Sequence, residues 1–259
     1  MGTVTKALSL LRYFNRAHPL IGLSELARLS GMNKATVHRM MTELQAEGFV
    51  EQAGTGREYR LGPAFLRLAA LREAAVPTRD LAHDVLADLS AATQETTHVS
   101  LLSGDQLTII SYAYSPVHGT RVTMEDAETL SLHATSSGLA VLAFSSPEFS
   151  DRILSRPLEK RTPQTETNPD VIRTRMADSR ARGFSESIGG FEKDVHSHAA
   201  PLFDARQQVI GAMAVAAPTA RMDDARKTNI RTELRRHAIR LTRAMGGFLP
   251  DGFERTDPA

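Results

Sequence analysis

The chain has 259 residues, of which 41% are hydrophobic, and it contains no cysteine. This length is sufficient for two domains, and the lack of cysteine excludes a disulfide framework and a thiolate metal site. The sequence has no apolar run near the roughly 18 residues that a membrane-spanning helix needs, and no signal-peptide pattern at its start. We therefore expect a cytoplasmic protein that makes no membrane contact.

The charge is distributed unevenly, although the net charge is only +1. Residues 1–76 hold 10 Lys and Arg against 6 Asp and Glu, and the remaining residues hold 21 against 24. A basic segment beside a mildly acidic body is typical of a small DNA-binding domain joined to a larger domain. The same imbalance also occurs on surfaces that bind no polyanion, so the charge alone does not decide between them.

The first 62 residues predict three helices. Apolar residues recur at helical spacing over 4–14, which indicates the first helix. A second, short helix follows, with Ser24 as its expected N-cap, and Gly31 is expected to form a tight turn after it. Asn33 is expected to cap a third helix, which Gly48 terminates.

Two short strands are predicted after the third helix, at residues 49–52 and 58–61, with a hairpin turn at Gly54–Thr55–Gly56. Two helices joined by a short Gly-containing turn and followed by a two-stranded ribbon predict a winged helix-turn-helix for residues 1–62. In such a motif the second of the two helices lies in the major groove of DNA. The residues expected to contact DNA are Ser24, Asn33, Lys34, Ala35, Thr36, His38, Arg39 and Arg57.

Two alternatives apply to this expected interface. The polar residues of an isolated helix are more often a solvated face, and only the neighbouring helix and ribbon favour DNA contact here. Arg57 fits a minor-groove or phosphate contact, but it is equally well explained as an exposed turn residue.

The pattern changes after this segment. Residues 63–77 predict a linker helix whose apolar side is available for dimer contacts or for packing against the winged domain. Residues 78–249 predict an α+β domain around a largely antiparallel sheet, and residues 250–259 a disordered tail. The expected strands are 98–103, 107–114, 120–124, 195–203 and 208–216, and the expected helices are 78–92, a segment within 130–144, 147–155, 168–182 and 221–245.

The stretch HATSSG, residues 133–138, predicts an anion site at the start of a helix. Small residues there leave backbone N–H groups free to point at a ligand, and a carboxylate is the natural partner. The alternative is a simple N-cap by Thr135 or Ser136.

Histidines raise two further possibilities. His196 and His198 point to the same face of one strand and could chelate a metal with His133 or His98. No acidic residue completes an obvious ligand set, and the same residues could contact an effector or be structural, so we expect no metal and no cofactor. A hydrolase using His133 with Ser136 or Ser137 is disfavoured, because the sequence lacks a nucleophile elbow, a Walker loop and a dinucleotide-binding motif. We expect no enzymatic activity.

The N-terminal run KALSLLRYF…LSELARLSGMNKATVHRMMTELQAEGFVEQ…REYRLGPAFLRLA strongly resembles the DNA-binding domain of IclR-type (isocitrate lyase regulator) bacterial transcription factors. LSLHATSSGLAVLAF and RARGFSES…FEKDVHSHAAPLFDARQQVIGAMAVAAP are similar to two elements of that family's effector domain. The three motifs occur in order over residues 4–245. The resemblance implies a winged helix-turn-helix, a linker helix and a GAF/profilin-like effector-binding domain, acting as a homodimer or a dimer of dimers on double-stranded operator DNA.

The resemblance also implies effector-binding positions. Ala214 and Ala216 stand where some members of the family present serines, which implies a roomier, less polar pocket for a ligand with an apolar or aromatic body and a small polar end. This departure puts in doubt a transfer of specificity for glyoxylate or pyruvate. The positions that the resemblance implies are Val122, Leu130, Ser136, Ser137, Val195, Ser197, Ala214 and Ala216. The histidine pattern adds His133 and His196 as candidate effector contacts.

Together these observations predict a ligand-responsive, sequence-specific transcriptional regulator. We expect a repressor of a catabolic operon, with a small organic acid (aromatic acids included) or a related carbonyl compound as effector. The alternatives are a small-molecule binding module whose head contacts proteins, and a His/Ser hydrolase.

Overall fold

The computed structural model describes residues 2–14, 18–53, 56–75, 78–125 and 128–253. The chain divides into two compact units, Met1–Pro77 and Thr78–Ala259. Among the described residues, no helix combines the length and the apolar character needed to cross a bilayer.

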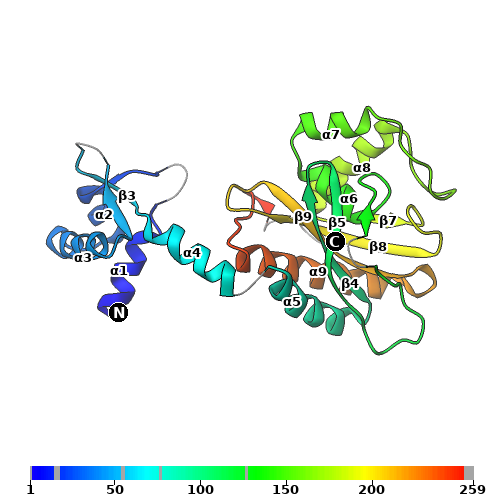
Figure 1. The fold of residues 1–259 in the computed structure, drawn as a ribbon, viewed down its shortest axis with the longest axis horizontal. Helices are drawn as coiled ribbons and strands as arrows, with labels where there is room; N and C mark the ends of the chain where they lie inside the picture. Colours follow the sequence, from blue (N-terminus) through cyan, green and yellow to red (C-terminus); the bar gives the residue numbers. More distant parts are fainter. Residues whose placement is uncertain (1, 15–17, 54–55, 76–77, 126–127, 254–259) are drawn as a thin grey trace. The chain divides into compact units, whose positions relative to one another are not determined.

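The first unit is a winged helix-turn-helix, as predicted (Figure 1). Its three short strands form an antiparallel sheet in the order β1-β3-β2. Strand β1 precedes the second helix and was not expected from the sequence. Residues 54–55 of the predicted hairpin turn lie outside the described part. The elements are α1 (Thr3–Leu11), β1 (Ile21–Gly22), α2 (Leu23–Ser30), α3 (Lys34–Ala46), β2 (Val50–Gln52), β3 (Glu58–Leu61) and α4 (Ala64–Ala75).

Of the N-cap residues predicted for α2 and α3, the first is wrong and the second is correct. Ser24 is not the N-cap of α2, because the pairing of β1 with β3 keeps the backbone extended up to Gly22, and the helix begins at Leu23. Asn33 does cap α3, since its side-chain oxygen accepts a hydrogen bond from the N–H of Ala35 at 2.8 Å. The positive end of α3 is thereby fixed at the surface.

The core of the first unit forms around α3. Val37, Met40, Met41 and Leu44 recur along one side of this helix and are all buried. Fully burying a side chain of this size contributes about 1.5–3 kcal/mol. The core also takes Leu10 of α1, but two residues of the predicted apolar face of α1 remain largely exposed. They are Val4 at 73% and Leu8 at 50%.

The second unit contains a six-stranded antiparallel sheet in the order β6-β5-β4-β9-β8-β7. Its strands are β4 (Thr96–Ser103), β5 (Gln106–Ala113), β6 (Thr129–Leu130), β7 (Ser185–Ile188), β8 (Val195–Phe203) and β9 (Val209–Pro218). Its helices are α5 (Thr78–Thr93), α6 (Ser136–Phe144), α7 (Pro147–Leu154), α8 (Pro169–Arg182) and α9 (Asp224–Ala244), with a 3₁₀ turn η1 (Thr219–Arg221) before α9.

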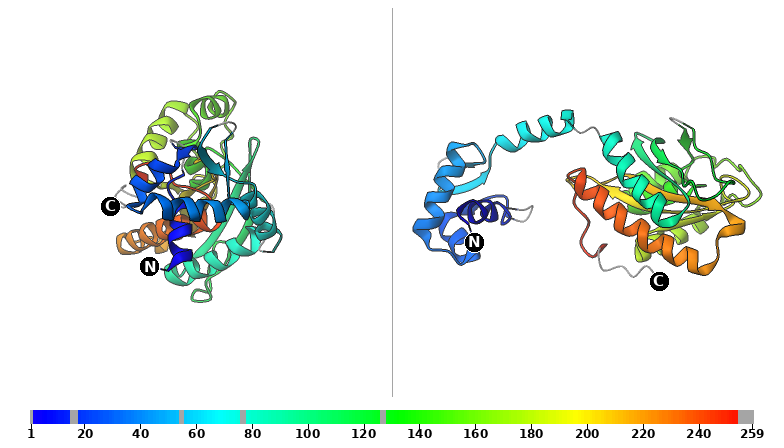
Figure 2. Two further views of the ribbon diagram at one scale, coloured as in Figure 1. Left: turned by 90° about the vertical axis from the view of Figure 1, so that its left-hand side faces the viewer. Right: turned by 90° about the horizontal axis from the view of Figure 1, so that it is seen from below.

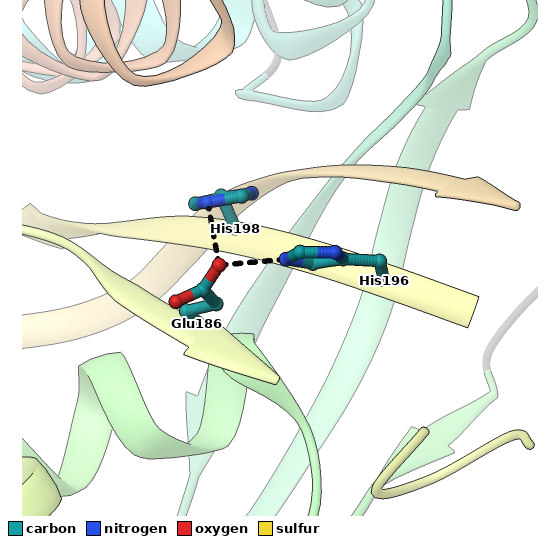
Figure 3. Close-up of side chains that lie close together, drawn as sticks. All are labelled: Glu186, His196 and His198. Atoms are coloured by element: carbon teal, nitrogen blue, oxygen red, sulfur yellow. Dashed lines mark hydrogen bonds and ion pairs between the residues drawn. The ribbon is translucent and has the colours of Figure 1, made fainter. Parts of the chain in front are cut away.

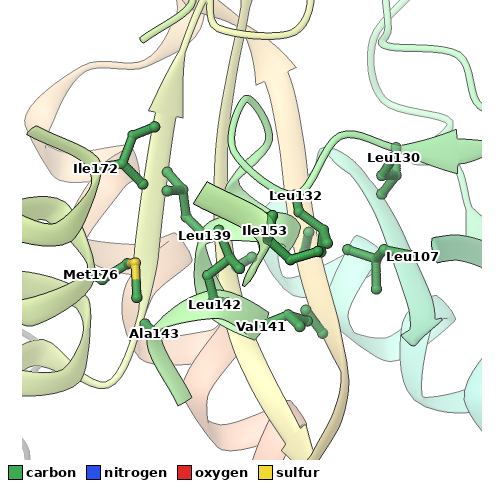
Figure 4. Close-up of a cluster of buried hydrophobic side chains, with 14 of the residues drawn as sticks. Leu107, Leu130, Leu132, Leu139, Val141, Leu142, Ala143, Ile153, Ile172 and Met176 are labelled. Carbon is green, nitrogen blue, oxygen red and sulfur yellow. The ribbon is translucent and has the colours of Figure 1, made fainter. Parts of the chain in front are cut away.

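Helices cover both faces of this sheet. On one face α6 lies in a core with α7 and α8, where Leu139, Leu142, Ile153 and Ile172 meet (Figure 4). On the other face α5 and α9 pack side by side (Figure 2). Because side chains alternate along a strand, neighbouring residues of β8 and β9 serve different cores.

Two local predictions in the second unit are wrong. Residues 120–124 form no strand, and side chains hold them instead of a sheet ladder; Thr96 Oγ1, for example, donates to the carbonyl of Val122 at 2.7 Å. Strand β7 was not predicted, because its residues Ser185–Ile188 are mostly polar. Ser185 and Ser187 point into the sheet's α6 face, where their hydroxyls donate to the carbonyls of Ser136 and Ala134.

The predicted tail is ordered over its first residues. Phe253 is 4% exposed and packs edge-on against Phe144 and Phe203, at 5.6 and 5.3 Å between ring centroids. Arg235 donates to its carbonyl at 2.7 Å. The expected disorder is therefore wrong for residues 250–253, because an aromatic side chain finds a core there, and residues 254–259 lie outside the described part.

Candidate DNA interface and effector cavity

One side of α3 is exposed and carries the predicted DNA contacts. Lys34, Ala35, His38 and Arg39 are exposed, and Thr36 is half-buried. Within the described residues, the side chains of Lys34 and Arg39 have no ion-pair partner. A flexible cation without a partner at a helix surface is suited to a phosphate or to the acceptor edge of guanine.

A groove lies beside this face, between the helices and the ribbon. It brings together Ser24, Lys34, His38 and Arg57, and therefore joins residues from α2, α3 and the ribbon. Glu25 lines the same groove, but Arg28 holds its carboxylate at 2.6 Å. Of the remaining predicted contacts, Asn33 uses its side-chain oxygen for capping, and Arg39 lies on the exposed face outside the groove.

In the second unit, α6 begins with two open backbone donors. Thr135 is its N-cap, because its hydroxyl accepts from the N–H of Gly138 at 2.9 Å. Among the described residues, no acceptor meets the N–H of Ser136 or Ser137. Gly138 allows this arrangement: a Cβ there would lie 2.4 Å from the Cα and carbonyl oxygen of Leu132.

A cavity that is partly open to solvent lies at this end of α6. Concave sites that combine apolar lining with a few convergent polar groups are typical of small-molecule binding. Seven of the ten predicted effector residues line it, namely Val122, Leu130, Ser136, Ser137, Val195, Ser197 and Ala216.

Three predicted effector residues lie elsewhere. His133 is fixed between the hydroxyl of Ser131, at 3.0 Å, and the carbonyl of Glu159, at 2.9 Å. His196 neighbours Ser197 on β8 and therefore points to the opposite face of the sheet. Ala214 is fully buried in the core against α6. These three residues therefore do not line the cavity.

Several residues that line the cavity were not predicted as effector contacts. Those with the clearest chemical consequence are His98, Met124, Glu128, Phe191 and Glu192. His98 and Met124 lie on predicted strands, and His98 was considered there as a metal ligand. The others lie in loops, where no periodic pattern indicates which way a side chain points.

Hydrogen bonds between side chains fix the polar wall of the cavity. Ser136 Oγ donates to Ser197 Oγ at 2.8 Å, and Ser137 Oγ lies 3.1 Å from His98 Nε2. His98 is 5% exposed, and its Nδ1 has no hydrogen-bond partner. This arrangement also disfavours the hydrolase alternative, since no acidic side chain among the described residues orients the His98 ring towards Ser137.

Burial lowers the pKa of His98 from 6.5 to about 4. Between these two values the unfolded chain binds a proton at His98 that the folded chain does not bind. The free energy of unfolding therefore falls as the pH falls through this window, by about 3 kcal/mol from this residue. We expect His98→Gln to flatten the dependence of stability on pH between 6.5 and 4, measured by urea denaturation at half-unit steps.

The matched control is His83→Gln, which removes an exposed histidine of the same unit. It should leave the slope unchanged. Equal slopes in wild type and His98→Gln would show that His98 is not the residue whose burial makes the protein sensitive to acid.

Glu186, His196 and His198 meet on the other face of the sheet (Figure 3). Glu186 Oε1 lies 2.7 Å from His196 Nε2 and 3.2 Å from His198 Nε2, and the two rings stack at 5.0 Å between centroids. Within the described residues this is the one histidine–carboxylate cluster with the spacing of a metal site. Glu186 is the acidic partner that the sequence analysis did not find, because it comes from the missed strand β7.

The cluster is already held together by its own contacts. The hydrogen bond from His196, with the His198 ring beside it, holds the pKa of Glu186 well below its usual range, and burial lowers the pKa of His198. The guanidinium of Arg231 lies 4.0 Å from the same carboxylate oxygen, where it would oppose a divalent cation. A metal ion bound by these residues would be repelled by the charge of Arg231. In the structure, the contacts of Glu186 with His196, His198 and Arg231 connect β7 with β8 and α9.

Comparisons with known proteins agree with both units. Residues 3–54 match the IclR helix-turn-helix domain, and residues 72–243 match the bacterial transcriptional regulator IclR C-terminal domain. The chain is 27% identical over 253 residues to the HTH-type transcriptional regulator XynR of Escherichia coli K12, covering 94% of this chain and 97% of that protein.

Solved structures extend the similarity. A crystal structure of an IclR transcriptional regulator from Silicibacter sp. TM1040 is 56% identical, covers 97% of this chain and 98% of its own, and superimposes with a TM-score of 0.92. An IclR homolog from Microbacterium hydrocarbonoxydans, crystallised with 4-hydroxybenzoate, shares the fold at 23% identity and a TM-score of 0.59, covering 95% of this chain and 99% of its own. The chain therefore belongs to the IclR family of ligand-responsive, DNA-binding bacterial transcription regulators, which act by binding and not by catalysis.

Proposed function

We propose that this regulator represses a catabolic operon and that a small organic acid, or a related carbonyl compound, releases it from its operator. The carboxylate or carbonyl of the effector accepts hydrogen bonds from the N–H groups of Ser136 and Ser137. The observation that carries this proposal is the pair of open donors at the start of α6, at a cavity lined by apolar residues. Helix N-termini bind anions through such groups and through the helix dipole.

The complex of the Microbacterium homolog with 4-hydroxybenzoate supports this class of effector. Its ligand has an aromatic body and a carboxylate. In this chain Val122, Leu130 and Ala216 supply an apolar wall for such a body.

We further propose that the protein acts as a homodimer or a dimer of dimers, with α3 of each copy in the major groove. The linker helix α4 supports self-association, because it exposes three leucines. They are Leu66 at 76%, Leu68 at 45% and Leu71 at 61%. In contrast, Phe65 packs edge-on against Phe49 at 5.4 Å and so belongs partly to the first unit.

Filling the cavity is expected to abolish the response while leaving DNA binding intact. Ala216 is 2% exposed and lines the cavity, so Ala216→Leu places extra carbon atoms where the ligand would lie. We expect at least a tenfold loss of affinity for the acids that bind the wild type, found by thermal shift with 4-hydroxybenzoate, 3-phenylpropanoate and butanoate. Operator binding should stay within twofold.

Ala220→Leu provides the control, since Ala220 is exposed and lies outside the cavity. It should bind the acids as the wild type does. Unchanged acid binding by a folded Ala216→Leu protein would place the effector elsewhere in the molecule.

A further inference from the structure

Among the described residues, the carboxylates of two glutamates line the effector cavity, and no Lys or Arg does. The carboxylates belong to Glu128, which is half-buried, and Glu192, which is exposed. Burial and then the charge of Glu192 raise the pKa of Glu128. A cavity wall of this kind repels an anion and attracts a cation.

Arg161 is a basic residue whose charge acts on Glu128, and it does not line the cavity. Its guanidinium stacks on the ring of Phe191 at 4.1 Å from the centroid, and its ion pair with Glu159 is 3.9 Å long. It offsets part of the negative charge of the two carboxylates without forming an ion pair with either of them. The carboxylates of Glu128 and Glu192 therefore still favour a cationic group in the cavity.

The same cavity also contains backbone donors that a hydrogen-bond acceptor of the ligand could satisfy. The N–H groups of Ser136 and Ser137 are open, and the start of α6 carries the positive end of the helix dipole. His98 gives a second, independent indication of a ligand, because it is 5% exposed, lines the cavity and leaves its Nδ1 without a partner. Buried polar atoms are rarely left in this state.

We propose that the effector is a zwitterion, an amino-carboxylate whose carboxylate binds at the N–H groups of Ser136 and Ser137 and whose ammonium group lies beside Glu128 and Glu192. This inference rests on the proposed function, because it describes the same site. It narrows the small organic acids to those that carry a cationic nitrogen.

The two simpler ligand classes fit the cavity less well. A plain acid satisfies the α6 donors but adds a third negative charge to a site that already holds two. A plain amine satisfies the carboxylates but leaves both N–H groups open. Only a molecule with a carboxylate and an ammonium group satisfies both the α6 N–H groups and the two glutamates. Met124 and Phe191 cover its apolar part.

The test uses matched sets of three probes that share one body: an amino acid, the acid without its amino group, and the amine without its carboxyl group. Suitable sets are phenylalanine, 3-phenylpropanoate and phenethylamine; leucine, 4-methylpentanoate and isopentylamine; and 4-aminobutanoate, butanoate and butylamine. Binding to the purified full chain is measured by saturation-transfer NMR and thermal shift. The variants are Glu128→Gln/Glu192→Gln and, as a control, Glu148→Gln, an exposed glutamate of α7 outside the cavity.

We expect the amino acid to bind at least tenfold more tightly than the other two members in at least one set. The double variant should lose this preference and bind the plain acid more tightly than the wild type does, while Glu148→Gln behaves as wild type. If the plain acids bind best in every set and the double variant does not change that order, the zwitterion is excluded and the organic-acid proposal stands. If no acid, with or without an amino group, binds the wild type, the organic-acid proposal itself fails, and this inference fails with it.

Discussion

Replacing Arg39 with alanine is expected to weaken operator binding by about 1–3 kcal/mol if its guanidinium reads a base. Arg39 is exposed on α3, one turn beyond Ala35, and has no ion-pair partner among the described residues. A bidentate contact to guanine is worth about this much. The measurement is fluorescence anisotropy with labelled DNA from upstream of the protein's own gene, repeated at several salt concentrations.

Arg12→Ala is the matched control, because it removes the same charge from an exposed position of the same unit. It should change affinity only slightly and equally for all DNA sequences. Ligand binding by the second unit should be unaffected in both variants. Equal losses from Arg12→Ala and Arg39→Ala would mean that the overall charge of the unit, and not α3, determines binding.

Replacing Glu95 with alanine is expected to destabilise the second unit by about 3–5 kcal/mol. The Glu95 side chain is 1% exposed, and its two oxygens lie 2.7 Å from Arg221 and 3.1 Å from Arg226. Removing the carboxylate leaves two partly buried guanidinium groups facing each other without a counter-charge. A loss of this size lowers the melting temperature by about 10 °C in a unit of this length.

An exposed pair in the same unit gives the control. Asp88 and Arg240 form an ion pair whose side chains are 55% and 53% exposed. Asp88→Ala should cost less than about 1 kcal/mol, because water screens exposed pairs. If the two variants melted at the same temperature, the buried cluster would not be what holds the start of β4 to α9.

The parts of the fold that the sequence predicts well have strong periodic patterns. Val37, Met40, Met41 and Leu44 recur as one helical face, and Asn33 marks the start of that helix, so α3 and its exposed side follow directly. The predicted start of the Ala-rich helix at HATSSG is similarly confirmed in α6. There the side chain of Thr135 provides the cap, which was one of the alternatives, and the open donors lie beyond it.

The errors occur where tertiary contacts outweigh local preference. Ser24 is a good capping residue, but the pairing of Gly22 with Glu58 keeps Gly22 extended and starts the helix one residue before Ser24. Strand β7 has few apolar residues, since Ser185 and Ser187 bond to carbonyls around α6. Nothing local in the sequence indicates those partners.

The effector cavity illustrates the same limit. Alternation along β8 separates Ser197, which lines the cavity, from His196, which faces α9, and this separation follows from strand geometry once the register is known. Glu128 and Glu192 come from loops far apart in the sequence. Only the folded chain shows that both glutamates line the cavity at the start of α6. Their position is the reason why we propose a zwitterion and not a plain acid as the ligand.

In the proposed complex, the exposed face of α3 lies in the major groove of the operator. Because the chain has no cysteine, Ala35→Cys creates a single attachment point for an iron–EDTA group on that face. We predict cleavage of the upstream DNA in clusters, with two clusters one helical turn (about 10–10.5 base pairs) or a multiple of it apart if a dimer binds, and none from the same group at Glu148→Cys on α7. If the bound protein cuts no DNA from position 35, or cuts equally well from position 148, α3 does not lie in the major groove.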